Sequence, residues 1–407
     1  MGLLAAVDEL AGDLVALLQR LIRIPTVNPP GDGYEDFVAD FGAYLDGLGY
    51  TTEVHRVPDD ELATLAPHAG GRPRLNLLAT LDQGDGPTIH LNGHYDVVPV
   101  GNDWTRDPFG GELNDGHVYG RGAADMKSGL AAQAIAVEAL RRTGFHGRIV
   151  HSAVPDEETV GVRNAGMGWL VENGHLQADA VIITEPFGPD GVGIGHKGAI
   201  WGEITVHGRS AHGSAPKLGV NAVEATARYL ARIDEELRPQ LDARTTDYRV
   251  TPDEPSATLS FDTIVGGAAT NIVPDRCTVT FNRRLVPGED LEQARRELLA
   301  PLDALGLTYD YRETYSTEPT LVGEHEPVVA AAKRAVTQLG LTPRILISAG
   351  SDDQRFVVHK AGITNSLVYG PGQTGLSHIA DERIAVDDLV LGTKGLALIL
   401  ADLLEAT

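Results

Sequence analysis

The sequence predicts an α/β protein built on a mostly parallel β-sheet, with a smaller α+β domain inserted into it. Short apolar runs typical of buried strands alternate with helix-length segments up to about residue 190. The same alternation of strand-like and helix-like segments resumes after about residue 305. Between these regions the order changes to strand, helix, strand, strand, helix. We therefore expect a first domain at residues 1–193 and 306–407, and an inserted domain at residues 194–305.

The first domain begins with an amphipathic helix and continues as alternating strands and helices. Strands need continuous apolar runs if both faces of the sheet are covered, whereas helices show apolar residues at helical spacing and end at glycine. The expected order is strand TIHLNGHYDVVP, helix SGLAAQAIAVEALRRTG ending at Gly144, strand RIVHSAVPDEE, helix NAGMGWLVENG and strand ADAVIITEP.

The inserted domain is expected to follow GVGIGHKG, which we interpret as a glycine-rich connector. Its strands show the alternation of a sheet with one covered face. The expected order is strand AIWGEITVHG, a helix from about Asn221 to Leu237, strands SATLSFDTIVGG and CTVTFNRRL, and a helix after Pro287 and Gly288.

Composition narrows the class of protein. The 407 residues are 42% hydrophobic, which is typical of a globular chain, and a net charge of −24 argues against nucleic acid or an anionic membrane as partner. No apolar run is long enough for a membrane span, so we expect a cytoplasmic protein. The only cysteine, Cys277, allows no intrachain disulfide; it is either a catalytic thiol or, as its strand-like surroundings favour, a buried structural residue.

Polar side chains gather where the predicted strands end, which is where open α/β sheets bind ligands. His94 and Asp96 in HLNGHYDVVP are two residues apart and would project from the same face of a strand. A carboxylate beside an imidazole can fix its tautomer and support a metal ligand. The alternative is a surface histidine near a surface aspartate.

Further carboxylates follow in the same setting. Asp125 lies in the glycine-rich turn GRGAADMKSG before a helix, where an N-cap is the alternative function. Glu157 and Glu158 end a strand in VPDEETVG; adjacent carboxylates repel unless a cation lies between them, although a solvated turn is also possible. Glu185 in ITEP ends another strand, and His378 lies in the loop GPGQTGLSHIADE.

These segments together resemble the M20 metallopeptidase family, which includes acetylornithine deacetylase, succinyl-diaminopimelate desuccinylase, aminoacylases and glutamate-releasing carboxypeptidases. The resemblance extends over roughly residues 15–400. The motifs that carry it, in family order, are NGHYDVVP, GRGAADMKSG, DEET, TEP, GRSAHGSAP, GGAATNIVP, RRLVPGE and GLSHIADE.

The resemblance implies a catalytic domain that holds two divalent metal ions. It implies one ion bound by His94 and Glu185, with Asp96 as the partner of His94, a second bound by Glu158 and His378, and Asp125 bridging the two. It also implies a cis peptide bond between Asp125 and Met126. Two histidines and three carboxylates form a nitrogen and oxygen ligand set that suits Zn²⁺, and also Co²⁺ or Mn²⁺.

For the reaction, the resemblance implies attack by a metal-bound hydroxide on the amide of a small N-acyl amino acid, with Glu157 as general base. A dipeptidase or carboxypeptidase, or a hydrolase of formamido or ureido groups, remains an alternative on the same residues. A binding module without catalysis is disfavoured because all the ligands and the base are present.

The resemblance also implies that the inserted domain is a lid that forms a homodimer. His212 would then reach the active site of the partner subunit and stabilise the oxyanion. Asn271 and Arg284 would hold the substrate carboxylate; the neighbouring Arg283 would face the other way on a strand. The stretch SAGSDDQRF, residues 348–356, resembles a pocket loop that varies with substrate.

Overall fold

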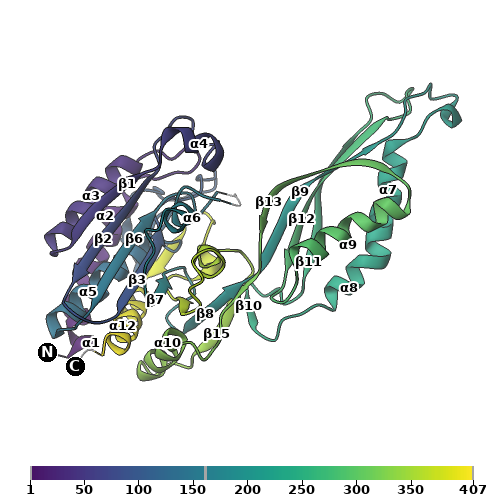
Figure 1. The fold of residues 1–407 in the computed structure, drawn as a ribbon. Helices are drawn as coiled ribbons and strands as arrows, with labels where there is room; N and C mark the ends of the chain where they lie inside the picture. Colours follow the sequence, from purple (N-terminus) through teal and green to yellow (C-terminus); the bar gives the residue numbers. More distant parts are fainter. Residues whose placement is uncertain (1, 160–162, 406–407) are drawn as a thin grey trace. The chain divides into compact units, whose positions relative to one another are not determined.

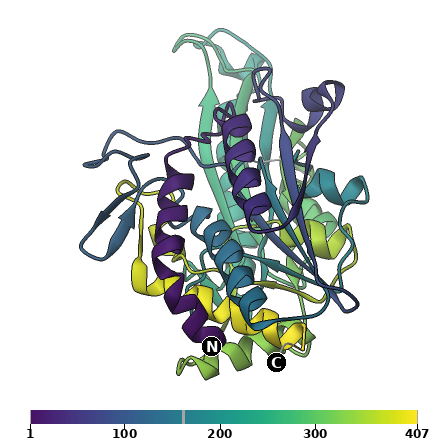
Figure 2. The ribbon, with the colours of Figure 1, turned by 90° about the vertical axis from the view of Figure 1, so that its left-hand side faces the viewer.

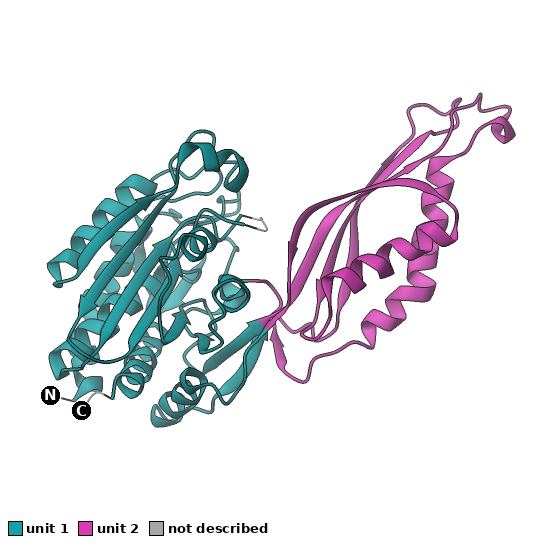
Figure 3. Cartoon of the chain, in the orientation of Figure 1, with its two compact units in different colours: residues 1–195, 321–347, 352–407 teal, residues 196–320, 348–351 magenta. Residues whose placement is uncertain are grey.

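The computed structural model describes residues 2–159 and 163–405 and separates them into two compact units (Figure 3). Unit 1 contains residues up to 195 together with residues 321–347 and 352–407, and unit 2 contains residues 196–320 and 348–351. In the sequence, most of unit 2 is therefore a single insertion, residues 196–320, within unit 1.

Unit 1 is organised around a twisted sheet whose centre is parallel (Figure 1). β6 and β7 both pair with β3 in parallel, and β16 continues the parallel part beside β7, whereas β1, β2 and β8 are antiparallel to their neighbours. Along the sheet, the strands are β1 (Thr51–Arg56), β2 (Leu75–Asp82), β6 (Arg148–Val154), β3 (Thr88–His94), β7 (Ala180–Ile183), β16 (Ser366–Val368), β8 (Gly191–His196) and β15 (Arg344–Ser348). This mixed α/β fold with a parallel centre confirms the predicted fold class.

One prediction about this sheet is wrong. The segment GVGIGHKG was expected to be a connector, but Gly191–His196 forms β8, which is buried along its whole length. Its glycines are required because other groups approach the strand closely: a Cβ on Gly193 would lie 2.2 Å from the Phe187 ring. Glycine here marks close packing and not a turn.

Helices cover the sheet, and their boundaries follow the sequence signals. α5 ends at Thr143 with Gly144 as its C-cap, as predicted, and packs beside α1, α2 and α12 (Figure 2). An apolar cluster includes residues of α4, α6 and α11 together with sheet residues such as Val181 and Ile183. The helices are α1 (Leu3–Glu9), α2 (Ala11–Ile22), α3 (Tyr34–Gly47), α4 (Asp59–Leu65), α5 (Lys127–Thr143), α6 (Met167–Glu172), α10 (Pro327–Gln338), α11 (Gln354–His359) and α12 (Val386–Leu403).

Short elements complete unit 1. β4 (Glu112–Asn114), β5 (His117–Tyr119) and β17 (Arg383–Ala385) form a three-stranded sheet. β14 (Thr320–Leu321) pairs with β8, and a 3₁₀ turn spans Thr374–Leu376. None of the helices within residues 2–159 and 163–405 is long and apolar enough to cross a membrane.

Unit 2 is a four-stranded antiparallel sheet covered by helices on one face. Its order is β11 (Thr258–Gly266), β12 (Arg276–Leu285), β9 (Gly198–His207) and β13 (Thr308–Thr317). Inward residues such as Ile204, Val279 and Phe281 pack with helix residues in one apolar cluster. Cys277 is buried in β12, which confirms the structural interpretation of this residue.

The helices of unit 2 follow the sequence closely. Asn221 is the N-cap of α7 (Ala222–Arg232), where its side chain accepts hydrogen bonds from the amides of Val223 and Glu224. A π-helical turn at Ile233–Leu237 continues into α8 (Arg238–Asp242), and α9 (Leu291–Ala304) follows Pro287 and Gly288. A short strand, β10 (Arg249–Thr251), and a 3₁₀ turn at Pro216–Leu218 lie in the connections.

The inserted domain was expected to end at residue 305, but β13 pairs with β9 along its length and so belongs to the sheet of unit 2. The burial of β13 alternates over residues 308–314, as in a sheet with one covered face, and its last three residues are all buried. The assignment of this unit as a lid and dimerisation domain stays a prediction.

The close approach of α5 to the sheet gives a testable prediction. A Cβ on Gly129 would lie 2.3 Å from the Thr184 carbonyl oxygen, so Gly129→Ala must push the helix from the sheet. We expect a loss of about 1–3 kcal/mol in the free energy of unfolding, measured by urea denaturation.

Gly12 is the matched control because it also lies in a helix, α2, but is exposed and has nothing within 4 Å of an added Cβ. Gly12→Ala should leave stability unchanged or raise it by up to about 1 kcal/mol. Equal effects of the two substitutions would contradict the packing argument.

Candidate metal centre

The candidate site lies where three neighbouring strands of unit 1 end. β3 ends at His94, β6 ends shortly before Glu157 and Glu158, and β7 ends shortly before Glu185. Because β6 and β7 are both parallel to β3, their carboxyl ends lie at the same edge of the sheet. Residues that are far apart in the sequence are thereby brought together.

His94 is buried, with 1% of its surface exposed, and both ring nitrogens have partners. Nδ1 lies 2.9 Å from the backbone carbonyl of Asp96, which can only accept, so Nδ1 carries the hydrogen. Nε2 is then free to bind a cation and lies 3.1 Å from Oδ1 of Asp125 and 3.6 Å from Oε1 of Glu185. The Asp96 carboxylate itself is 3.6 Å from Nδ1, so the backbone of this residue makes the hydrogen bond.

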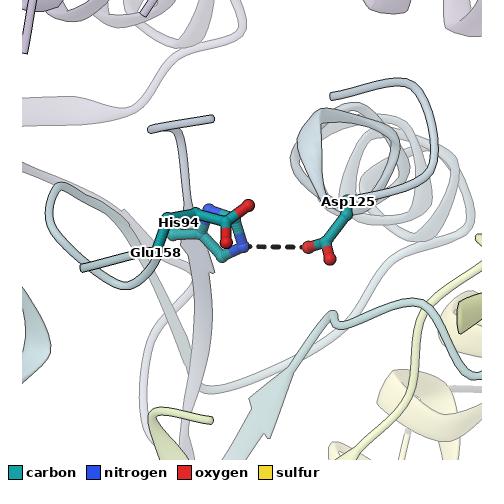
Figure 4. Close-up of side chains that lie close together, drawn as sticks. All are labelled: His94, Asp125 and Glu158. Carbon is teal, nitrogen blue, oxygen red and sulfur yellow. Dashed lines mark hydrogen bonds and ion pairs between the residues drawn. The ribbon is translucent and has the colours of Figure 1, made fainter. Parts of the chain in front are cut away.

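Asp125 lies just before α5, and Figure 4 shows its carboxylate facing the ring of His94. Its Oδ1 faces His94, and its Oδ2 lies 3.5 Å from Nε2 of His378. The peptide bond between Asp125 and Met126 is cis, as the family resemblance implied. The two oxygens of one carboxylate therefore face two different imidazoles.

Glu382 holds the backbone on which Asp125 sits. Its Oε1 accepts hydrogen bonds from the amides of Gly122, Ala124 and Asp125 at 2.9–3.0 Å, and its Oε2 accepts one from Arg121 at 2.6 Å. The Glu382 side chain is fully buried, so these bonds are not in competition with water. Sequence reasoning missed Glu382, although it lies four residues after His378 in a motif that was quoted.

Glu158 and His378 form the other side of the cluster. Nε2 of His378 lies 3.0 Å and 3.1 Å from the two carboxylate oxygens of Glu158. His378 has a positive φ of 61°, a backbone conformation that is uncommon for residues other than glycine and that is frequent at functional sites. Atoms of His94, Asp125 and Glu158 all lie within 4.8 Å of one another.

Glu157 and Glu185 lie on the His94 side. Atoms of His94, Glu157 and Glu185 also lie within 4.8 Å of one another. Glu185 is 8% exposed, and the structure brings it to the cluster although it is more than ninety positions from His94 in the chain. The two sets share His94, so the residues expected as metal ligands form one continuous group.

The protonation equilibria of this group reflect crowded negative charge. Burial raises the pKa of Glu157 and of Glu185 well above their usual range, and the charges of neighbouring carboxylates add to this effect. Burial alone would lower the pKa of His94, but Glu185 and Asp125 raise it well above its usual value. The hydrogen bond with Glu158 raises the pKa of His378 to about 9.

The raised pKa values of Glu157, Glu185, His94 and His378 all favour the protonated form of the group. The site therefore favours additional positive charge. Without a cation, carboxylates this close can coexist only by taking up protons or by pairing with protonated histidines. Imidazole nitrogens and carboxylate oxygens that converge within a few ångström are also the donor set of divalent transition ions. The residues present therefore fit a metal centre.

A buried hydrogen-bonded network supports the loop that carries Glu157 and Glu158. The Asp96 carboxylate accepts hydrogen bonds from the backbone amides of both glutamates, each at 3.2 Å. The Asn28 side chain donates to Asp96 at 2.9 Å and to Asp156 at 2.8 Å. Asp96 thus fixes the backbone of the glutamate pair as well as the ring of His94.

Arg74 completes this network. It forms an ion pair with Asp156 at 2.7 Å, and both side chains are fully buried. Asp156 has a positive φ of 64°, so its backbone is held in an uncommon conformation directly before Glu157. No periodic pattern or motif singles out Asn28 or Arg74, because both lie in segments away from the quoted motifs.

The remaining predicted residues lie in unit 2. His212 is exposed; its Nδ1 accepts a hydrogen bond from the Ser214 amide at 3.1 Å, and a backbone bridge pairs it with Ile272, next to the exposed Asn271. Unit 2 therefore brings His212 and Asn271 together, as an exposed loop.

The two neighbouring arginines of β12 have different surroundings. Arg283 is 2% exposed and is paired with Glu289 on the helix-covered face of the sheet. Arg284 lies on the opposite face, where its guanidinium stacks 5.1 Å from the Trp201 ring and its Nε donates to Asn282 at 3.1 Å. Arg284 has no carboxylate partner among the described residues, which distinguishes it from Arg283.

Comparisons with known proteins show the family to which this chain belongs. Residues 90–402 match the sequence profile of peptidase family M20/M25/M40. The chain is 34% identical over 395 residues to a succinyl-diaminopimelate desuccinylase of Rhodospirillum centenum, covering 94% of this chain and 95% of the relative. The chain belongs to the M20 family. It is a metal-dependent hydrolase of amide bonds, of the deacylase or peptidase type.

Solved structures show the same fold. A tripeptidase from Staphylococcus aureus superposes with a TM-score of 0.75 at 21% identity, covering 97% of this chain and 99% of the other. A protein from Bacillus subtilis described as a dinuclear metal binding peptidase of the M20 family superposes with a TM-score of 0.66 at 15% identity, covering 98% and 100%. At these identities the likeness concerns the fold.

The buried ion pair beneath the site leads to a prediction. Arg74→Met leaves the Asp156 carboxylate buried without its charge partner, and such a loss typically costs about 3–5 kcal/mol of the free energy of unfolding. The loss should appear in urea denaturation.

Arg20→Met is the matched control, because Arg20 and Asp40 form an ion pair at 2.7 Å whose side chains are 46% and 29% exposed. Exposed pairs contribute about 0–1 kcal/mol. If both variants lost the same small amount, the Arg74 network would not be the support described above.

Proposed function

We propose that this chain is a two-metal amidohydrolase that removes the acyl group from a small N-acyl amino acid, with an N-succinyl diamino acid as the leading substrate. The observation that carries the proposal is the Asp125 carboxylate, whose two oxygens face His94 and His378 respectively. The relative from Rhodospirillum centenum, which is matched along nearly the whole chain, supports the choice of acyl group.

In this proposal His94, Asp125 and Glu185 would hold one ion, and Asp125, Glu158 and His378 would hold the other. Zn²⁺ suits this nitrogen and oxygen donor set best, and Co²⁺ and Mn²⁺ are the other candidates. Ions of this kind act as Lewis acids that polarise a carbonyl group and make water more acidic.

Glu157 is the proposed general base. Burial raises the pKa of its carboxyl above the usual range, and bound cations would offset part of this rise. An atom of Glu157 lies within 4.8 Å of atoms of His94 and Glu185, close enough to act on a water bound there. Glu157 would remove a proton from the attacking water and deliver it to the departing amine. Asp96 would orient both Glu157 and Glu158 through their backbone amides.

The proposed substrate-binding residues of unit 2 have matching chemistry. Because Nδ1 of His212 accepts from the Ser214 amide, a neutral His212 carries its hydrogen on Nε2, where it could donate to an oxyanion. Asn271 would help to bind the carboxylate of the substrate. Arg284, without a carboxylate partner among the described residues, would bind the carboxylate of the substrate.

We further propose a homodimer through unit 2, with His212 acting in the site of the partner subunit. β11 is an edge strand, and its Ile264 and Val265 are 56% and 71% exposed. Leu218 and Ile272, near His212, are also exposed. Apolar residues on an edge strand mark a surface that can pair with another chain. The cytoplasmic location stays a prediction.

A substrate screen tests the proposed reaction. Protein stripped with a chelator should be inactive, and Zn²⁺, Co²⁺ or Mn²⁺ should restore hydrolysis. Of N-succinyl-diaminopimelate, N-acetyl, N-formyl and N-carbamoyl amino acids and dipeptides, the succinyl substrate should show the highest kcat/KM. Full activity of the stripped protein would overturn the metal role, and faster hydrolysis of dipeptides would favour a peptidase.

The two adjacent glutamates should respond differently to amide substitution. Glu157→Gln removes the base and keeps the metal ligands, so we expect retained metal content with activity lowered by about 10²–10⁴. Glu158→Gln should lower the metal content itself, measured by elemental analysis. The reverse pattern would exchange the two assignments.

A mixing experiment tests the role of His212. His212→Ala should lower kcat by about 10²–10³, and Glu157→Ala should be inactive. After subunit exchange, hybrid dimers would contain one intact site, and activity should return to roughly a quarter of the wild-type rate. Exchange confirmed by mass without recovery of activity would contradict a role in the partner's site.

A further inference from the structure

Two adjacent aspartates before α11 differ in how their charges are satisfied. Asp352 and Asp353 are 5% and 1% exposed. A carboxylate in such a setting is unfavourable unless hydrogen bonds or a cation replace the lost water. Both belong to unit 1, and neither was assigned a role in the metal centre.

Asp353 is satisfied within the protein. Its Oδ2 accepts a hydrogen bond from Asn92 at 2.9 Å, and its Oδ1 accepts a longer one from Asn164 at 3.4 Å. Asn92 lies on β3, two residues before His94. Asp353 therefore connects the start of α11 by a hydrogen bond to β3, the strand that ends at His94.

Asp352 is satisfied on one oxygen only. Its Oδ1 accepts a hydrogen bond from the Gln354 amide at 2.8 Å, whereas its Oδ2 is buried and has no hydrogen-bond donor among the described residues. Burial raises the pKa of Asp352 to about 7, against the opposing effects of the Gln354 hydrogen bond and the charge of Arg355. An oxygen of the ionised carboxylate can only accept, so the ionised form needs a donor at Oδ2. For a buried charge the most favourable donor is itself positively charged.

The location of Asp352 relates it to the reaction. Asp352 directly precedes Asp353, whose side chain is hydrogen-bonded to Asn92, two residues before His94 on β3. Burial, and with it the charges of Asp125 and Asp352, raises the pKa of Glu185. A cationic group bound at Asp352 would also offset the excess negative charge there.

We propose that Oδ2 of Asp352 accepts a hydrogen bond from an ammonium group of the substrate, at a position away from the amide that is cleaved. Asp352 is then the residue that selects N-acyl diamino acids over N-acyl amino acids with an uncharged side chain. The inference rests on the proposed function and adds the specificity-determining contact for its substrate class. It involves no covalent step.

Binding of product-like ligands tests this contact without requiring hydrolysis. Diaminopimelate and 2-aminopimelate differ by one amino group, and their dissociation constants for the metal-loaded protein can be measured by calorimetry. Wild type should prefer diaminopimelate. Asp352→Asn should weaken diaminopimelate binding roughly 10- to 100-fold, as expected for a lost hydrogen bond to a charged group, and should leave 2-aminopimelate unchanged.

Asp353→Asn is the matched control, because it removes a neighbouring buried carboxylate that already has its partners. It should affect both ligands to the same extent. Thermal melting and metal analysis of both variants report folding and metal content. Asp352→Glu, which keeps the charge, should retain part of the preference.

The inference is overturned if wild type binds both ligands equally, if Asp352→Asn keeps the preference, or if Asp352→Asn loses metal, since Asp352 would then be a metal ligand. These results differ from failure of the proposed function. A protein that prefers diaminopimelate but does not hydrolyse the succinyl substrate would retain the Asp352 contact and lose only the acyl assignment.

Discussion

The two-sided contact of the Asp125 carboxylate is the constraint on which the candidate site depends. One oxygen faces His94 and the other faces His378, and these histidines are separated by most of the chain. Glu382 makes this possible by accepting hydrogen bonds from the amides of the turn that holds Asp125. A second, buried carboxylate thus fixes the backbone of the residue whose two oxygens face the two histidines.

Beneath this centre, stability and function share the same residues. Asp96 accepts from the amides of Glu157 and Glu158, Asn28 joins Asp96 to Asp156, and Arg74 neutralises Asp156. Buried polar groups are tolerated when every member has a partner. The network therefore allows several carboxylates to lie close together below a site that itself attracts cations. Several buried side-chain atoms of the described residues have no hydrogen-bond partner, and Oδ2 of Asp352 is the carboxylate oxygen among them.

The division into two units separates the proposed tasks. The residues that converge as a cation site all belong to unit 1, whereas His212, Asn271 and Arg284 belong to unit 2. Unit 1 uses the carboxyl ends of a parallel sheet, where side chains from successive strands meet. Unit 2 uses an antiparallel sheet with one covered face, which leaves Arg284 and Trp201 on the other face. Each type of sheet suits the chemistry proposed for it.

The sequence by itself determined the α/β class, the helix that ends at Gly144, the helix that begins near Asn221 and the residues that converge at His94, because periodicity, helix ends and motifs are local signals. It misassigned Gly191–His196 as a connector, since glycines required by close packing look the same as glycines of a loop. It also ended the inserted domain before β13, whose membership depends on pairing with β9. Glu382, Asn28, Arg74 and the contrast between Asp352 and Asp353 were decided only by the tertiary structure. Whether a buried polar group has a hydrogen-bond partner depends on residues far away in the chain. A local sequence pattern therefore cannot predict that partner.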